Sequence, residues 1–431
     1  MVVPDISART IALDLLAAVL GSKRPLNEAF DDHPALQRMN ARDTALARNI
    51  ITTTIRRLGQ IDVLIDACLE KPIQRKDWMV HDILRLGVCQ LLFMRTPSHA
   101  AVDTAVTLTK KRGFPHYAKL VNAVLRRLDR EGRAIVKKQD AGKTNTPEWM
   151  WESWVTAYGE AQAHAIADAH LSEAPLDITI KGSDSKAWAK KLEAEILPTG
   201  TLRRKAGGRI EDLPGYEAGA WWVQDAAAAL PVRLLGNVKG KFIIDLCAAP
   251  GGKTAQLATM GAHVTAVDKS PRRLKMLESN LTRTGLKAET VVADAANWRP
   301  PEKVDAVLLD APCSATGTIR RHPDVPYLKS ADDVAKLSVQ QLRFLAAAVD
   351  MVKPGGLLVY CACSLQPEEG RDRIAAILDT TAPIERVPVK AKEVEGMDEF
   401  ISKEGDLRTL PNFFAKEGGM DGFFAARLRR Q

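Results

Sequence analysis

The chain has 431 residues, of which 46% are hydrophobic and 26% charged, a composition typical of a soluble globular protein with two or three domains. No apolar run approaches the roughly 20 residues that span a bilayer, and the N-terminus lacks the basic and apolar regions of a secretion signal. The six cysteines do not follow the spacing of a disulfide framework, which favours a reducing compartment. We therefore expect a cytoplasmic protein without a membrane anchor.

Positive charge is concentrated near the N-terminus. The formal net charge is +8, and residues 1–140 contain 23 Lys and Arg against 15 Asp and Glu, whereas the remaining 291 residues contain 38 of each. This excess predicts a polyanionic partner for the N-terminal third. A well-solvated helical surface is the alternative interpretation.

Helical periodicity dominates residues 5–135, where apolar residues recur at spacings of three and four. We expect a helical bundle over residues 1–138, with helices over Ala8–Leu20, Arg42–Leu69 (two helices broken near Gly59), Val80–Phe93, Ala100–Lys111 and Tyr117–Arg130. Ser98 follows Pro97 and is expected to cap the fourth of these stretches. Most apolar residues here are core, so the candidates for RNA contact are basic ones such as Lys110–Arg112 and Arg126–Arg127.

A polar, turn-rich segment, residues 137–149, is interpreted as a linker to a small α+β module over residues 147–234. The elements expected there are a short helix with Trp149, Trp151 and Trp154, a strand over Pro175–Lys181, a helix over Asp184–Ile196 and a Gly/Arg-rich turn over Arg203–Arg209. Two roles stay open, because the module could present bases to a catalytic domain or serve structure alone. The tryptophans are expected in the core rather than as stacking platforms.

Residues 235–431 alternate between predicted strands and helices. The apolar strands cover Lys241–Cys247, His263–Lys269, Glu289–Asp294, Val304–Asp310 and Leu357–Cys363. This alternation predicts an α/β domain with a doubly wound, mostly parallel, Rossmann-like sheet. Such sheets bind ligands where loops leave the carboxyl ends of strands, and the candidate functional residues all lie at those ends.

The segment Ala248–Thr254, AAPGGKT, follows the first of these strands and precedes a helix expected to begin near Thr254. Its small residues let the backbone approach a ligand closely, although it has neither the dinucleotide-binding nor the P-loop spacing. Asp268, Asp294 and Asp310 end successive strands. Asp268 can accept ribose hydroxyls and Asp294 can meet an adenine amino group, which suits S-adenosylmethionine better than NAD. A lone acid at such a position is otherwise a helix cap.

Several motifs resemble those of the Nop2/Sun family of RNA cytosine-C5 methyltransferases. They are DLCAAPGGKT, VDKSPRRLKMLESNLTRTG (Val267–Gly285), DAPCSATGTIRRHPDV (Asp310–Val325), CSLQPEEG (Cys363–Gly370) and MDGFFAARL (Met420–Leu428). They run in the family's order over roughly residues 220–431, and the helical region resembles the NusB-like RNA-binding fold attached to the family's bacterial Sun branch, which modifies 16S ribosomal RNA. The resemblance implies S-adenosylmethionine as cofactor and a cytosine of 16S rRNA as substrate.

The resemblance also implies roles for individual residues. Cys363 would attack cytosine C6, Cys313 would assist loss of the C5 proton and product release, Asp310 would bind the N3/N4 edge, and Lys253 would supply positive potential. The expected cofactor contacts are Cys247, Ala248, Ala249, Pro250, Gly251, Gly252, Lys253, Asp268, Arg273, Asp294 and Asp310. The expected RNA contacts after the Cys313 loop are Arg320, Arg321 and His322.

Other features of the chain limit these implications. Cys361 lies on the same strand face as Cys363, and it is interpreted as an inert small hydrophobe, as are Cys68, Cys89 and Cys247. Cys361 and Cys363 are too close in sequence for a CxxC zinc site, so no metal is expected. Ala315 stands where the family usually has glycine, and DITIK after Leu176 replaces its usual Arg-Val-Asn strand. We expect a monomer; a transfer-RNA methyltransferase and a non-catalytic RNA-binding or antitermination factor stay open as alternatives.

Overall fold

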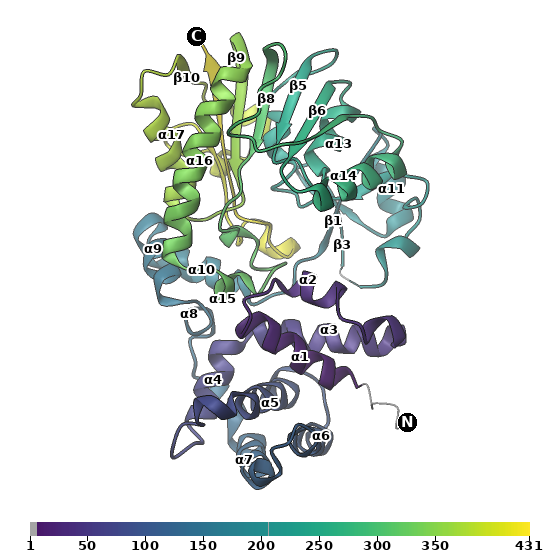
Figure 1. Cartoon of the computed structure of the whole chain (residues 1–431), viewed down its shortest axis with the longest axis vertical. Helices are drawn as coiled ribbons and strands as arrows, with labels where there is room; N and C mark the ends of the chain where they lie inside the picture. The colour runs from purple at the N-terminus through teal and green to yellow at the C-terminus, as the bar shows by residue number, and fades with distance from the viewer. Residues whose placement is uncertain (1–6, 206) are drawn as a thin grey trace. The chain divides into compact units, whose positions relative to one another are not determined.

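The computed structural model describes residues 7–205 and 207–431 (Figure 1). The chain divides into two compact units, one formed by the residues up to Leu171 together with Arg321–Ser330, the other by Ser172–Arg320 together with Ala331–Gln431. The start of the predicted helical region and residue 206 of the predicted Gly/Arg-rich turn lie outside the described residues. The three-part division of the chain stays a prediction.

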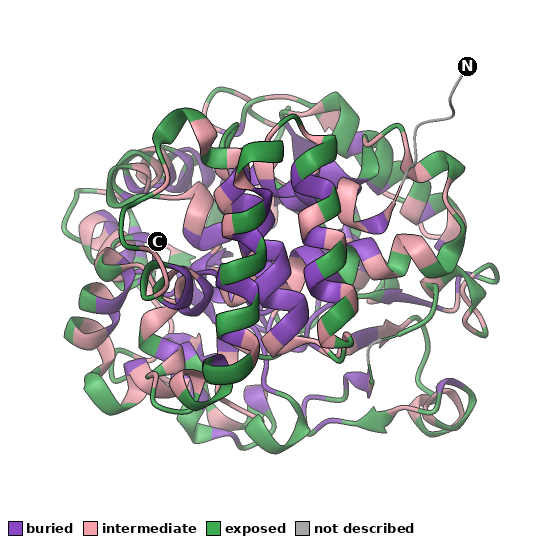
Figure 2. Ribbon diagram, turned by 90° about the horizontal axis from the view of Figure 1, so that it is seen from below, coloured by how far each residue is buried: buried purple, intermediate pink, exposed green. Residues whose placement is uncertain are grey.

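The first unit is built from amphipathic helices whose apolar stripes face one core (Figure 2). Its main helices are α1 (Ala8–Leu20), α2 (Leu26–Asp31), α3 (Ala41–Arg56), α4 (Leu58–Asp66), α5 (Trp78–Val88), α6 (Ser98–Lys111) and α7 (Ala118–Val136). A π-helical turn, Cys89–Phe93, continues α5. The predicted helices are therefore present.

One local prediction in this unit, the helix break near Gly59, is confirmed, and another, the cap by Ser98, is wrong. The helix break lies at Arg57, and Gly59 is inside α4, where a Cβ would lie 2.0 Å from the Thr144 carbonyl oxygen. Gly59 is thus needed for close packing rather than for a break. Ser98 is the first residue of α6 and does not cap it, because its Oγ donates a hydrogen bond of 2.7 Å to Asp129 Oδ1 on α7.

The predicted linker, residues 137–149, is ordered helix and turn within the first unit. It contains α8 (Ala141–Thr144) and leads into α9 (Glu148–Tyr158), which is followed by α10 (Glu160–His170). Gln60 Nε2 donates to Gln139 Oε1 at 3.0 Å, and Asn145 Nδ2 donates to Gln60 Oε1 at 3.0 Å. These amide bonds tie the segment to α4. Trp151 and Trp154 are buried core residues, as expected.

Residues 321–330 return to the first unit from the C-terminal half of the sequence. Their short helix α15 (Val325–Leu328) packs against α1. Asp324 Oδ2 accepts a hydrogen bond of 2.8 Å from the Leu26 backbone N–H, and Lys23 Nζ donates to the Tyr327 carbonyl oxygen at 2.9 Å. This segment is therefore a structural part of the helical unit.

The second unit begins with a small antiparallel sheet in the order β2-β3-β1-β4. Its elements are β1 (Leu176–Ile180), α11 (Ser185–Leu192), β2 (Glu195–Ile196), β3 (Leu202–Arg204) and β4 (Trp221–Val223). The helix expected over Asp184–Ile196 ends early because Glu193 adopts a left-handed conformation, with φ of 51°. Arg203 was expected in a turn but lies within β3, where Asp177 of β1 neutralises its buried guanidinium through two hydrogen bonds of 2.7 Å.

The large sheet of the second unit has the strand order β10-β12-β9-β8-β5-β6-β7. The five predicted strands form its parallel part as β5 (Phe242–Leu246), β6 (His263–Asp268), β7 (Glu289–Val292), β8 (Val304–Asp310) and β9 (Val352–Ala362). Three antiparallel additions were not predicted as strands: β10 (Ile384–Arg386), β11 (Leu407–Thr409) and β12 (Phe423–Arg430). The α/β, mostly parallel fold is confirmed.

Helices cover both faces of this sheet, because alternate strand residues contribute to two different cores. On one face lie α12 (Leu230–Arg233), α13 (Gly252–Thr259) and α14 (Pro271–Thr284); on the other lie α16 (Ala331–Met351) and α17 (Arg371–Leu378). Figure 1 shows α16 running beside β9 and β8. The loops after β5, β6, β7, β8 and β9 leave at one edge, where the candidate residues gather.

Candidate active site

Two cysteines meet at the carboxyl ends of neighbouring parallel strands. Cys313 follows β8 and Cys363 follows β9, and the register pairs Asp310 with Cys361. Each cysteine therefore leaves its strand at the same level of the sheet. Their Sγ atoms lie 3.4 Å apart, and both side chains are half-buried. The structure thus brings together the two thiols that the sequence analysis singled out.

The Cys313 loop is held by a carboxylate that the sequence analysis did not assign. Glu369, fully buried in the PEEG segment, accepts hydrogen bonds from the Ser314 backbone N–H at 2.9 Å and from Ser314 Oγ at 2.5 Å. Gln341 Nε2 on α16 donates to Glu369 Oε1 at 3.1 Å and to the Pro312 carbonyl oxygen at 2.9 Å. Burial raises the pKa of Glu369. The acidic residues of the PEEG segment were the sequence signal for this support of the Cys313 loop.

The loops of Cys313 and Cys363 are also joined through backbone contacts. The Gly317 N–H donates to the Cys363 carbonyl oxygen at 3.0 Å, and the Gly422 N–H donates to the Gly317 carbonyl oxygen at 2.8 Å. A Cβ on Gly317 would lie 1.9 Å from the Gly422 carbonyl oxygen, so a side chain there has no room. The chain before β12 therefore packs directly on the loop that carries Cys313.

Ala315 explains why glycine is usual at its position. It adopts a left-handed conformation, with φ of 59° and ψ of 24°, just before the turn Thr316–Thr318. An L-residue with a Cβ pays about 1–2 kcal/mol for this conformation, whereas glycine does not. Alanine in place of glycine at this position therefore introduces backbone strain two residues from Cys313.

A buried ion pair lies next to the thiols. Lys253 Nζ on α13 donates to Asp310 Oδ2 at 2.7 Å and lies 4.9 Å from the centre of the Phe423 ring. Burial works to lower the pKa of Lys253, but the carboxylate of Asp310 outweighs it and the pKa is raised. Lys253 is therefore charged. Asp310 keeps 32% of its side chain exposed, so one edge of the carboxylate is open to a ligand.

The thiols differ in environment. Burial and the nearby Asp310 carboxylate raise the pKa of Cys361, whose Sγ lies 3.5 Å from Asp310 Oδ1 and which has no exposed surface. It is a neutral core residue, as expected. The hydrogen bond with Cys363, together with burial, raises the pKa of Cys313. Either sulfur can be the donor in this hydrogen bond.

The loop after β5 is fixed by polar contacts from β6 and α14. Asp268 Oδ2 accepts a hydrogen bond of 3.2 Å from the Ala249 backbone N–H, and Arg273, which also bonds the Ala249 carbonyl oxygen, lies 3.6 Å from that carboxylate. Gly251 has φ of 101°, and a Cβ there would lie 2.7 Å from Leu277 Cγ. Only glycine fits this start of α13, which begins at Gly252 rather than Thr254.

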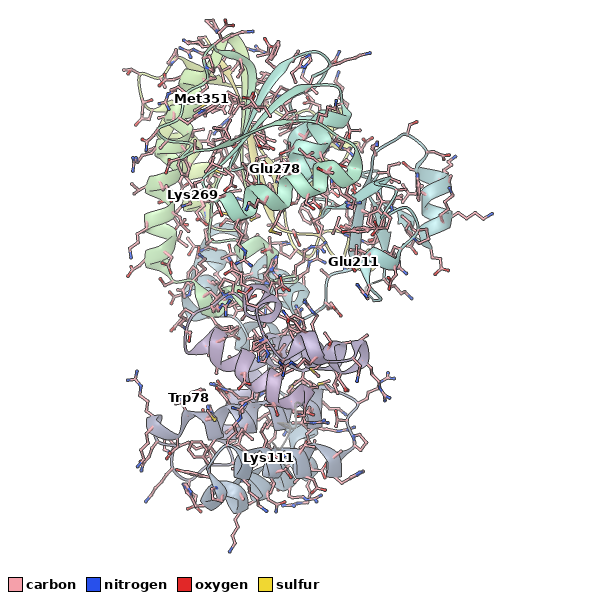
Figure 3. All side chains as sticks on the ribbon, turned by 45° about the vertical axis from the view of Figure 1, so that its right-hand side comes forward. Trp78, Lys111, Glu211, Lys269, Glu278 and Met351 are labelled. Carbon is pink, nitrogen blue, oxygen red and sulfur yellow. The ribbon has the colours of Figure 1, made fainter. Side chains whose placement is uncertain are left out.

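A pocket opens beside this loop. Four residues of its walls are expected cofactor contacts: Cys247, Asp268, Arg273 and Asp294. The other wall residues were not predicted from the sequence: Val267, Lys269, Ala293, Ala295, Pro312 and Phe344. Lys269 is labelled in Figure 3. Phe344 reaches the pocket from α16, which is distant in sequence. Ala248, Ala249, Pro250, Gly251 and Gly252 shape the adjoining loop, whereas Lys253 and Asp310 pair with each other and do not line the pocket.

Comparison with known proteins identifies the family. The pattern of the family described as 16S rRNA methyltransferase RsmB/F matches residues 232–429, and that of the NusB family matches residues 6–130. Proteins named ribosomal RNA small subunit methyltransferase B from Vibrio cholerae and Pasteurella multocida are 35% and 33% identical over 99% of this chain and 98% and 96% of their own. The chain belongs to the small subunit methyltransferase B family.

Solved structures agree with this family's fold. The crystal structure of PH0851 superposes with a TM-score of 0.76 over 99% of both chains at 24% identity, which shows a shared fold. A methyltransferase homologue from Pyrococcus horikoshii superposes with a TM-score of 0.55 at 26% identity and covers 66% of this chain and 95% of its own. The methyltransferase B family thus accounts for both the NusB-like helices and the Rossmann-like sheet.

Arg320, one of the three basic residues after the Cys313 loop, is not available to RNA in this methyltransferase B family member. Arg320 is 1% exposed, and its guanidinium lies 3.3 Å from Asp421 and 3.6 Å from Asp225. Burying a charged side chain is tolerated here because two carboxylates neutralise it. Arg320 therefore supports the loop instead of binding RNA. Arg321 and His322 are partly exposed and belong to the helical unit.

The remaining cysteines of this family member match the expected inert role. Burial raises the pKa of Cys89 to about 12, and burial also raises the pKa values of Cys68 and Cys247. Within residues 7–205 and 207–431, side chains do not form a cluster suited to a metal ion. In the same described residues, every helix is too short or too polar to cross a membrane.

Proposed function

We propose that this methyltransferase B family member transfers a methyl group from S-adenosylmethionine to C5 of a cytosine in 16S ribosomal RNA. The observation that carries the proposal is the pair of sulfurs 3.4 Å apart, next to the Lys253–Asp310 ion pair at the carboxyl edge of the sheet. The names of the curated relatives support the small-subunit substrate.

The pocket beside Ala248–Gly252 fits the proposed cofactor. Asp268 and Asp294 place carboxylates where ribose hydroxyls and an adenine amino group can donate to them, and Phe344 offers an apolar wall to an adenine ring. The first backbone N–H groups of α13 add positive potential. When bound, S-adenosylmethionine supplies an electrophilic methyl group on a sulfonium.

The two cysteines supply covalent catalysis, which cytosine needs because its C5 is a poor nucleophile. The Cys363 thiolate forms a bond to C6, and the electron pair of the C5–C6 double bond moves into the ring and makes C5 nucleophilic. Asp310 accepts a hydrogen bond from the N4 amino group, while the charge on Lys253 stabilises the negative charge that develops on the ring. C5 then takes up the methyl group.

Release reverses the addition. A base takes up the C5 proton, and Cys313, 3.4 Å from the nucleophile, assists this step. The electron pair of that C–H bond restores the C5–C6 double bond, and the C6–sulfur bond breaks to return the Cys363 thiolate. The target base has to leave its stack to reach this buried edge.

Bisulfite sequencing of RNA from a deletion strain tests the proposal. We expect one 5-methylcytosine of 16S rRNA to disappear and to return when the gene is restored. Loss of a transfer-RNA mark with 16S rRNA unchanged would assign the alternative substrate. Purified protein that binds cofactor and 16S rRNA but transfers no labelled methyl group would support the non-catalytic alternative.

A further inference from the structure

We propose that the outward face of α7 is a second RNA-binding surface, which holds the backbone of a single-stranded rRNA segment outside the target nucleotide. The proposal rests on the proposed function only for the identity of the RNA. The surface consists of Lys119, Arg126, Arg130, Arg133 and Lys137, here called the basic row. All five side chains are exposed.

Helical geometry places the basic row in one line. At 3.6 residues per turn these positions fall within about 60° of each other around α7, and at 1.5 Å per residue they extend over about 27 Å. Val121, Leu125 and Leu128 are buried on the opposite side. The row therefore faces solvent along the length of the helix, a length suited to an extended polyanion.

The composition of the row argues against an ordinary solvated face. The positions beside the row are the uncharged Asn122, Ala123 and Ala134, which leave room for a phosphate to approach. The acids nearest in sequence are engaged elsewhere, because Asp129 Oδ1 accepts a hydrogen bond of 2.7 Å from Ser98 Oγ and Glu131 pairs with Arg127 at 3.1 Å. Like charges four residues apart destabilise a helix, and here Arg126 with Arg130 and Arg133 with Lys137 have that spacing. A bound polyanion offsets this repulsion.

A pocket lies at the C-terminal end of the row. It has a volume of about 410 Å³ and is lined by Leu92, Phe93, Met94, Arg95, Arg133, Val136 and Lys137. The lack of a Cβ on Gly132, which would lie 2.7 Å from Leu92 Cδ1, lets the π-helical turn Cys89–Phe93 pack against α7. Apolar walls with a cationic rim suit an unstacked base with its phosphate. Single-stranded RNA therefore fits both the row and the pocket.

Salt-dependent binding of the full-length protein tests the basic row. The probe is unmodified 16S rRNA transcribed in vitro, without S-adenosylmethionine, so that binding is measured apart from methyl transfer. The test variant is Arg126→Gln with Arg133→Gln, and the control is Lys71→Gln with Lys76→Gln, which removes the same charge from exposed sites elsewhere on the helical unit. Circular dichroism confirms that both variants fold, since glutamine is a good helix former.

We expect the test variant to weaken binding roughly 25-fold at about 0.1 M salt and to reduce the slope of log affinity against log salt by about 1.4, because each lost phosphate contact contributes about 0.7. The control variant should retain the wild-type slope. Equal slopes of log affinity against log salt for wild type, test variant and control variant would show that the basic row does not bind RNA, whether or not the wild-type protein methylates. Row-dependent binding without methyl transfer would instead uphold the surface and reject the proposed function.

Crosslinking tests the pocket independently. With 4-thiouridine in the transcript, ultraviolet irradiation of the wild-type complex should join RNA to peptides containing Phe93–Arg95 or Arg133–Lys137, identified by mass spectrometry. The substitutions in the test variant should reduce these crosslinks and leave the crosslinks to the second unit unchanged. Crosslinks confined to other segments of the wild-type protein would show that the pocket does not hold RNA.

Discussion

Cys313 Sγ and Cys363 Sγ lie 3.4 Å apart, although 50 residues separate them in the chain. The parallel pairing of β8 with β9 sets this distance, and the buried Glu369 carboxylate fixes the loop between Cys313 and α16. A hydrogen bond joins Cys313 to the sulfur that has to act as a nucleophile in the proposed reaction. This relationship gives the two thiols different roles in the proposed reaction.

The first prediction separates these roles. Cys363→Ala should abolish methyl transfer but retain S-adenosylmethionine binding, because the pocket walls do not include Cys363. Cys313→Ala should still attack the base but fail to release it, leaving a protein–RNA adduct visible on a denaturing gel. Cys361→Ala is the control and should keep most activity, since Cys361 is a buried neutral thiol. An adduct in the Cys363→Ala protein would contradict the assignment.

The second prediction concerns the strain at Ala315. Ala315→Gly should stabilise the protein by about 1 kcal/mol, because glycine adopts the left-handed conformation without a steric cost. The matched control is Ala346→Gly on the exposed side of α16, which should destabilise by about 1 kcal/mol. Thermal unfolding measures both. If the two substitutions shift the unfolding temperature in the same direction, the conformation assigned to Ala315 is not the native one.

The third prediction concerns the buried pair in the small sheet. Arg203→Met should destabilise the second unit by about 3–5 kcal/mol, because it leaves Asp177 as an uncompensated buried charge. Arg209→Met removes the same charge from a side chain that is 71% exposed, and it should change stability by less than about 1 kcal/mol. Calorimetric unfolding compares the two. Similar unfolding temperatures for both variants would refute the structural role of Arg203.

The fourth prediction is a pH dependence centred on Asp245. Burial raises the pKa of this carboxyl, which accepts a hydrogen bond of 2.6 Å from Thr254 Oγ1, to about 7. Its unfolded pKa is about 3.9, so the stability that its protonation contributes is full below that pH and is lost as pH rises through about 7. Asp245→Asn should therefore stabilise the protein relative to wild type at about pH 8, and this advantage should shrink as pH falls below about 7 and vanish below about pH 3.9.

Asp305 provides the opposite control for that experiment. Hydrogen bonds from Lys353 and the Phe242 backbone N–H lower the pKa of Asp305. Its stabilising effect is therefore present above its unfolded pKa and is lost as pH falls through the lower folded value. Asp305→Asn should destabilise at neutral pH, and the gap to wild type should narrow on acidification. Thermal unfolding measured across the pH range distinguishes the opposite pH dependences expected for the Asp245 and Asp305 variants.

The sequence by itself determined the local elements whose patterns are strong. Apolar periodicity located α1, α6 and the five parallel strands, and the residues at their ends marked Cys313, Cys363, Asp268 and Asp294 as candidates. These inferences succeed because side-chain periods of 3.6 and 2 are local properties. Motif order was sufficient to indicate the family, which the full-length relatives confirm.

Only the tertiary structure decided which side chains are accessible and which support others. Arg320 resembled an RNA contact until its burial between Asp225 and Asp421 was seen, and residues 321–330 return to the helical unit although they follow the Cys313 loop. Phe344 reaches the site from a segment without a local signal of this role, and the contact of Glu369 with Ser314 is visible only in the tertiary structure. Burial and charge pairing depend on residues far apart in sequence, so a one-dimensional pattern cannot contain them.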